Sequence, residues 1–183
     1  MGGVVGSGLG LGAVHRARLS FRSVNRRESP GYEPGLQRHH ILPRQILTHT
    51  SFAPMLAALG IEQIGFDDFR RNGLLLPAND AAAVRIGLPL HRGPHRDYNA
   101  LVMERLGQIE ATWSAGRLRA PEVALIDAYQ RLELLQRALR RRLLVQQRRL
   151  QLNRHDPLGS GVDFSELDAM AAQLWPATAP AES

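Results

Sequence analysis

Cysteine and lysine are both missing from the chain, and aromatic side chains make up only 5% of it. Without cysteine there is no disulfide and no thiolate-bound zinc, so any metal must be held by histidine, carboxylate, amide or water. No run approaches the about 20 apolar residues that span a bilayer. Residues 1–14 lack the basic and apolar regions of a signal peptide. We therefore expect a protein that is cytoplasmic, or secreted by a specialised system without a recognisable signal peptide, and no membrane partner.

All of the positive charge comes from arginine. The 23 basic residues outnumber 17 acidic ones, which gives a net charge of +6 and a pI near 11.0. A guanidinium group can grip phosphate with two parallel hydrogen bonds. A GC-rich coding sequence would also replace lysine with arginine, but it would not create the net charge. The charge therefore predicts a polyanionic partner such as nucleic acid.

The 183 residues are enough for one globular domain with its own core. Composition divides the chain into three parts. Residues 1–35 are rich in Gly, Ser, Arg and Pro and are expected to form a flexible basic arm. Residues 36–116 carry the sequence motifs, and residues 117–183 are expected to form an arginine-rich helical extension with a frayed tail.

Two short strands are expected, each close to a polar motif. Residues 39–43 indicate a strand ended by proline. Asn72 and Gly73 are typical of a turn, and residues 74–77 that follow indicate a buried strand. Asn79 is a good cap for a brief helix after it.

Helices account for most of the remaining pattern. Residues 45–59 are expected to be helical, with Pro54 splitting the stretch. Apolar spacing predicts a long helix from near Pro94 to Gly116, a second one over residues 121–153, and a last short one over 164–175. The fold class is therefore expected to be α+β and mostly helical.

Five of the seven histidines lie between residues 39 and 95. Four form two pairs, the adjacent His39 and His40 and the spaced His91 and His95. Successive side chains of a strand point to opposite faces, so one ring of the first pair can face a metal and the other a water molecule. Gly93 and Pro94 interrupt the second pair, so regular helix geometry does not bring its two rings together. Histidine clustering of this kind indicates metal binding or acid–base chemistry.

Three stretches of the sequence resemble a known family when they are taken in order. They are RHHILPRQ, NGLLLP and LPLHRGPHRDYNALV, within residues 37–102. Together they resemble the AHH group of the HNH/endonuclease VII (His-Me finger) superfamily of nucleases, which are common as bacterial toxin domains. Arg38 stands where the family name implies alanine, a flanking position that carries no catalytic group.

The resemblance implies a ββα-metal core in residues 36–116, with one divalent ion (Mg²⁺, Mn²⁺, Ni²⁺ or Zn²⁺). By position, His39 is similar to the first metal ligand and His40 to the general base. Asn72 is similar to the asparagine that holds the base or its loop in place. His91 and His95 are similar to the remaining metal-side histidines, and which of them binds the ion directly stays open.

Further residues near these motifs are expected to support the site. Tyr98, one turn after His95, could support the metal ligands from behind. The arginines that flank the histidines are expected to bind the nucleic-acid backbone: Arg38, Arg44, Arg92 and Arg96.

Together these features predict a metal-dependent endonuclease that hydrolyses phosphodiester bonds in DNA, in preference to RNA. The resemblance alone implies a toxin role and an acidic immunity protein as partner. One alternative is a non-catalytic module, in which a structural metal stabilises a nucleic-acid-binding domain. Another is a helical interaction module, in which the segment 121–153 mediates oligomers.

Overall fold

A two-stranded antiparallel sheet lies at the centre of the fold. The computed structural model describes residues 17–145 and 150–159. In that part of the chain β1 (Leu36–His40) pairs with β2 (Gly73–Pro77) and no further strand joins them. The last residue of β1 lies opposite the first residue of β2, so the end of β1 and the start of β2 lie at the same end of the ribbon.

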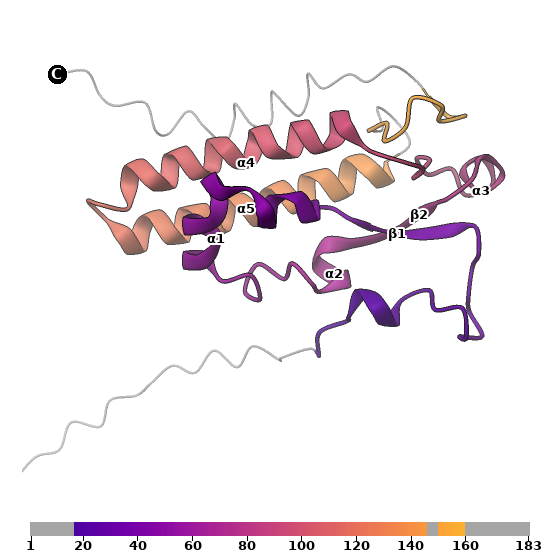
Figure 1. Ribbon diagram of the computed structural model, residues 1–183, viewed down its shortest axis with the longest axis horizontal. Helices are drawn as coiled ribbons and strands as arrows, with labels where there is room; N and C mark the ends of the chain where they lie inside the picture. Colours follow the sequence, from indigo (N-terminus) through magenta and orange to yellow (C-terminus); the bar gives the residue numbers. More distant parts are fainter. Residues whose placement is uncertain (1–16, 146–149, 160–183) are drawn as a thin grey trace, which may run out of the picture.

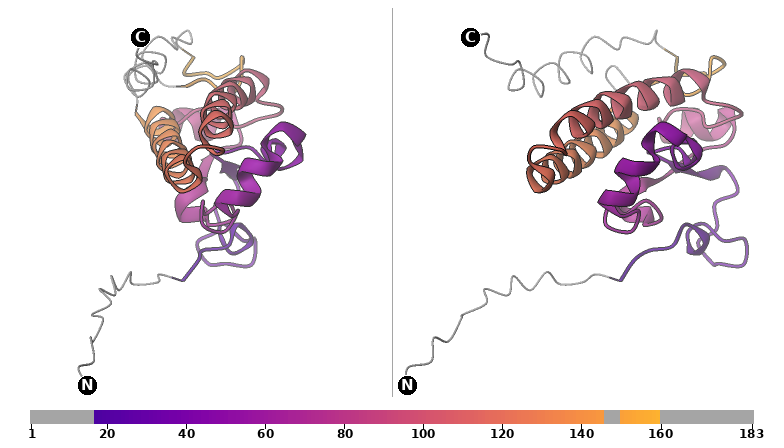
Figure 2. Two further views of the ribbon diagram at one scale, coloured as in Figure 1. Left: turned by 90° about the vertical axis from the view of Figure 1, so that its left-hand side faces the viewer. Right: turned by 60° about the vertical axis from the view of Figure 1, so that its left-hand side comes forward.

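Two long helices form one side of the molecule. Figure 1 shows α4 (Arg96–Gly116) and α5 (Pro121–Leu144) side by side and antiparallel, and Figure 2 shows α1 (Ala53–Leu59) packed against them. Proline suits the first turn of α5 because that position needs no amide hydrogen. Small strands combined with these helices confirm the predicted α+β, mostly helical fold class.

The segment between β1 and β2 is helical in pieces. Two 3-10 helices, η2 (Arg44–Thr48) and η3 (Thr50–Phe52), precede α1. Pro54 occupies the first turn of α1, so the long helix expected over residues 45–59 is split before this proline. These pieces bury Ile46, Phe52, Met55, Leu56 and Leu59 in the core behind the sheet.

Short helices flank β2 on both sides. Asn72 is the last residue of α2 (Phe69–Asn72), so a helical turn leads directly into the strand where a plain turn is expected. After the strand, the side chain of Asn79 accepts a hydrogen bond from the Ala82 amide at 2.9 Å and caps α3 (Asp80–Ile86), as predicted.

The segment before β1 is attached to the core from residue 17 onward. It contains η1 (Phe21–Ser23), and Leu19 exchanges hydrogen bonds with α2 through the Asp68 side chain and the Phe69 amide. A flexible arm was expected over residues 1–35, but residues 17–35 are attached to the core. Polar groups of Asp68 and Phe69 provide hydrogen-bond partners for this backbone. Residues 1–16 lie outside the described chain.

The C-terminal part departs from the expected helix over residues 121–153. Helix α5 ends at Leu144, and Val145 adopts an extended conformation. The Leu150 amide donates to the carbonyl of Arg142 at 3.1 Å, so the chain has turned back onto its own helix. The helical spacing of leucines in the sequence continues past the end of the helix because Leu150 is also a core residue, with 1% of its surface exposed. The helix expected over residues 164–175 lies outside the described chain.

One apolar core joins the sheet to the helices. Ile41 and Leu42, just after β1, pack with Leu101, Val102 and other buried residues of α4. Within the described ranges, none of the helices combines the length and apolar character needed to cross a membrane.

Candidate metal centre and catalytic site

The adjacent histidines at the end of β1 point to opposite sides of the ribbon, as alternation along a strand requires. His39 is buried, with its ring centre 4.9 Å from that of His91 and 5.6 Å from that of His95. His40 instead stacks flat on Phe21, with ring centres 3.7 Å apart and an interplanar angle of 2°. One strand therefore supplies both a group inside a histidine cluster and a group outside it.

Three histidines from two distant stretches of chain converge. One ring nitrogen from each of His39, His91 and His95 lies within 4.8 Å of the others. Three nitrogens bound to one ion at 2.0–2.1 Å in tetrahedral geometry lie about 3.4 Å from one another, so the rings must approach by up to about 1.4 Å to share a single cation. The cluster joins the end of β1 to the loop that precedes α4.

Local backbone contacts explain how the second pair reaches the strand. The His91 amide donates to the carbonyl of Pro77, the last residue of β2, at 2.7 Å. His95 is the N-cap residue of α4, and its carbonyl accepts from the Asn99 amide. Gly93 between them has a φ of 75°, a conformation that glycine adopts without strain.

Two nitrogens of this cluster lack the partner that buried polar atoms normally have. His39 Nε2 and His91 Nδ1 are buried and have no hydrogen-bond partner among the described residues. An unsatisfied buried polar group costs free energy and needs an explanation. A metal ion bound to these nitrogens would explain why they lack hydrogen bonds. The cluster therefore fits a single cation held by histidine alone.

Burial keeps the cluster neutral. Desolvation, reinforced by the neighbouring His91, His95 and His40, holds the pKa of His39 well below its usual range. Burial and the adjacent His95 lower the pKa of His91 to about 4, and burial also lowers the pKa of His95. Neutral imidazole is the form that binds a metal, so these three rings are ready to coordinate at neutral pH.

The ring of His40, on the other side of the strand, is neutral at physiological pH. Burial, reinforced by Arg44, lowers its pKa to about 4, although Asp67 acts in the opposite direction. Its Nε2 is buried and has no hydrogen-bond partner in residues 17–145 and 150–159. At neutral pH the ring is therefore unprotonated.

An aromatic stack holds the plane of the His40 ring. Phe21 lies on its face, Phe69 meets Phe21 edge-on at 5.1 Å, and Phe66 lies 5.8 Å from His40. A Cβ atom on Gly73, which pairs with His40 across the sheet, would come within 2.2 Å of the Phe69 ring. Only glycine at this position leaves Phe69 in place behind the stack.

The side chain of Asn72 fastens the backbone that follows His40. Its Oδ1 accepts from the Leu42 amide at 2.7 Å, and its Nδ2 donates to the carbonyls of Leu42 at 3.3 Å and Phe66 at 3.0 Å. The Asn72 carbonyl also accepts from the Ile41 amide at 2.8 Å. Because Asn72 is completely buried, no water can replace these bonds.

Tyr98 supports the same strand end from α4. Its hydroxyl donates to the carbonyl of Ile41 at 2.7 Å, and its ring meets the His39 ring edge-on with centres 5.2 Å apart. Full burial raises the pKa of the Tyr98 hydroxyl, so the group stays a donor at every physiological pH. The residue thus contacts His39 and the Ile41 backbone.

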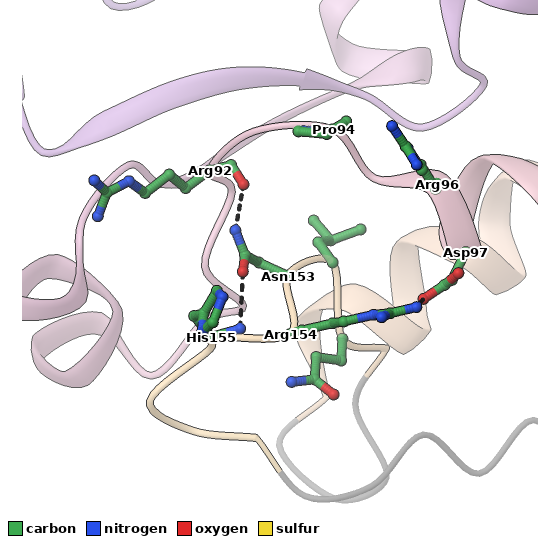
Figure 3. A pocket seen from close by; sticks show the side chains of 9 residues that line it. Arg92, Pro94, Arg96, Asp97, Asn153, Arg154 and His155 are labelled. Carbon is green, nitrogen blue, oxygen red and sulfur yellow. Dashed lines mark hydrogen bonds and ion pairs between the residues drawn. The ribbon is translucent and has the colours of Figure 1, made fainter.

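The four arginines expected to bind nucleic acid are all exposed. Arg38 donates to the carbonyls of Phe21 at 2.9 Å and Val24 at 3.5 Å, so it also ties η1 to the strand. Arg44 lies close enough to lower the pKa of His40. Arg92 and Arg96 line a hollow of about 320 Å³, which Figure 3 shows from close by.

Two features of the site were not anticipated from the sequence. The stack of Phe21 on His40 involves an N-terminal segment whose composition is typical of a loose arm. The contact between His95 Nδ1 and the Leu152 carbonyl, at 3.3 Å, comes from a stretch expected to be helical. Neither contact has a local sequence signal, because each joins residues far apart in the chain.

Comparison with known proteins assigns the chain to a family. Neither a curated protein nor a solved structure matches it. Residues 20–139, which include β1, β2, α4 and the histidine cluster, match AHH, described as a nuclease family of the HNH/ENDO VII superfamily with conserved AHH. The match covers well over half of the chain, and nucleic acid is the substrate class of a nuclease. The chain therefore belongs to the AHH family of nucleases, within the HNH/endonuclease VII superfamily.

Proposed function

We propose that this nuclease is a metal-dependent endonuclease that hydrolyses phosphodiester bonds in DNA. The observation that carries the proposal is the convergence of His39, His91 and His95, whose ring nitrogens lie within 4.8 Å of one another. A purely structural histidine cluster would satisfy its buried nitrogens with hydrogen bonds. Here His39 Nε2 and His91 Nδ1 have no such partner in the described chain, which supports a divalent ion as their partner.

Three histidine ligands leave room for substrate at the ion. His39, His91 and His95 would hold the divalent ion, which would supply polarisation of the phosphate and stabilisation of the negative charge on the leaving oxygen. In residues 17–145 and 150–159 the cluster contains only neutral histidine ligands and no carboxylate, so its side chains would not neutralise the charge of a bound ion.

His40 is the proposed general base. It is neutral at physiological pH, it sits next to a ligand on a rigid strand, and its ring plane is held by Phe21. In the reaction, a neutral His40 ring nitrogen takes a proton from the attacking water, whose oxygen forms a bond to phosphorus as the phosphodiester bond breaks. Asn72 and Tyr98 act as positioning residues, since both fix the backbone immediately after His40.

The charge of the chain supports a nucleic-acid backbone as the group that is bound. Arg44, Arg92 and Arg96 are exposed beside the site, and the net charge of the whole chain is +6. Contacts between arginine and phosphate carry little sequence information, so we expect weak sequence specificity and a strong dependence of binding on salt.

A cleavage panel tests the proposal. Supercoiled plasmid, single-stranded DNA and RNA are incubated with the metal-stripped protein and Mg²⁺, Mn²⁺, Ni²⁺ or Zn²⁺ added separately. We expect plasmid nicking with at least one ion, its loss in EDTA, and faster cleavage of DNA than of RNA. Tight binding without cleavage under every ion would refute the enzyme and favour a structural metal site.

Two histidine variants identify the base. His40→Ala should abolish cleavage while the protein still folds and binds the metal, because its ring lies outside the cluster. His49→Ala is the matched control, since this exposed histidine stacks on Phe52 and belongs to neither group. Full activity in His40→Ala would disprove the assignment of the base.

A further inference from the structure

Residues 150–159 lie outside the stretch that matches the AHH family and pack against its metal-side loop. Leu150 and Leu152 are 1% and 5% exposed, so apolar anchors fix the segment to the core. Figure 3 shows Asn153 directly below Arg92 and Arg154 extended toward Asp97 at the start of α4. We call residues 150–159 the clasp.

The clasp bonds to the backbone on both sides of His91. The carboxylate of Asp156 accepts from the Leu90 amide at 3.0 Å. The amide nitrogen of Asn153 donates to the carbonyl of Arg92. Because the His91 amide also donates to the carbonyl of Pro77, the backbone is held by a hydrogen bond at each of the three successive residues Leu90, His91 and Arg92.

The clasp also contacts the ring of His95. Nδ1 of His95 lies 3.3 Å from the carbonyl oxygen of Leu152. A carbonyl oxygen only accepts, so Nδ1 must carry the hydrogen of this bond. In the neutral ring the lone pair then lies on Nε2, and the hydrogen bond fixes which nitrogen is free to bind a metal.

We propose that the clasp positions both metal-side histidines, and that Asn153 and Asp156 are positioning residues that set the affinity of the site for its ion. This inference rests on the proposed metal centre. Partners that orient a ligand histidine commonly change metal affinity by about 10- to 100-fold. The loop needs such support because Gly87, Pro89, Gly93 and Pro94 exclude regular structure from it.

Each positioning side chain is itself held rigid by a turn of the clasp. Oδ1 of Asn153 accepts from the His155 amide at 2.8 Å, while its nitrogen reaches the loop. One carboxylate oxygen of Asp156 accepts from the Leu158 amide at 3.0 Å, while the other reaches Leu90. The exposed pair of Arg154 and Asp97, 3.7 Å apart, adds little because water screens it.

The test is a metal titration of the full, metal-stripped chain by calorimetry, with Zn²⁺ and Ni²⁺ as probes. Asn153→Ala changes no charge, and we expect it to weaken binding by about 10- to 100-fold. Asp156→Ala removes the second anchor independently, and Asp156→Asn, which keeps an oxygen for the Leu90 amide, should restore most of the affinity. His155→Ala is the matched control, because it removes an exposed clasp side chain and leaves these bonds intact.

A second readout needs no metal. In ¹⁵N spectra of the histidine rings, His95 of the metal-free chain should carry its hydrogen on Nδ1. Asn153→Ala and Asp156→Ala should shift that signal toward a mixture of the two tautomers. Unchanged affinity and an unchanged His95 tautomer in both variants would overturn the proposal. A wild-type chain that binds neither ion would instead refute the metal centre itself, so the two failures are distinguishable.

Discussion

Replacement of Asn72 by aspartate should damage the protein far more than the same change at Asn25. The two side chains make matching bonds, since each Oδ1 accepts from one backbone amide and each Nδ2 donates to two carbonyls. Aspartate keeps the acceptor and loses both donors at either position. The difference lies in burial, because Asn72 is 0% exposed whereas Asn25 is half-buried on the N-terminal segment.

The expected cost follows from the groups left without a partner. A buried polar group that loses its hydrogen bond costs about 1–3 kcal/mol, so the carbonyls of Leu42 and Phe66 together cost about 2–6 kcal/mol. A buried carboxylate facing two carbonyl oxygens adds to this. At Asn25 water can replace the lost donors, and the cost should stay near 1 kcal/mol. For a chain of this size 1 kcal/mol corresponds to about 2–4 °C in Tm.

Thermal and urea unfolding followed by circular dichroism measure this difference. We expect the Tm of Asn72→Asp to lie at least about 2 °C below that of Asn25→Asp. At a temperature where both variants are folded, kcat for plasmid nicking should fall by about 10- to 100-fold in Asn72→Asp alone, because the backbone after His40 shifts. Equal Tm and equal kcat in the two variants would refute the role given to the Asn72 hydrogen bonds.

Three further outcomes are expected. Tyr98→Phe should lower the free energy of unfolding by about 1–3 kcal/mol, because it leaves the buried Ile41 carbonyl without its donor; an unchanged urea midpoint would contradict this. Phe21→Ala should raise the pKa of His40 from about 4 toward its usual value by exposing the ring, so the acid limb of the pH profile of kcat/KM should move to higher pH. The pKa of His91 is lowered to about 4 in the folded, metal-free chain. Between pH 6.5 and 4 this residue is therefore protonated in the unfolded chain and neutral in the folded chain. Stability should therefore fall as the pH drops from 7 to 5, by at most about 2 kcal/mol from this residue, and urea unfolding of His91→Gln should lack that part of the loss.

Local sequence signals were sufficient for the elements that depend on their own residues. Asn79 caps α3 and Pro121 begins α5, as the capping preferences of these residue types predict, and α4 ends at Gly116 as expected from the sequence. The opposite directions of His39 and His40 also follow from strand alternation alone.

Helix ends that depend on distant partners were harder to predict. The apolar spacing continues through Leu143 to Leu150, yet α5 ends at Leu144. Leu150 packs into the core from a chain that has turned back, so a buried leucine at helical spacing was not evidence of a helix. Likewise, the composition of residues 17–35 did not indicate that Phe21 stacks on the ring of His40.

The sequence by itself determined which residue types could do the chemistry: a chain without cysteine, rich in arginine, with an adjacent and a spaced pair of histidines. Only the tertiary structure decided that His39 meets His91 and His95, that Phe21 covers His40, and that the clasp fixes the His95 ring. Local preferences act through neighbours a few residues away. These contacts join residues about 20 to 60 positions apart, and they form only when the shared core brings those segments together.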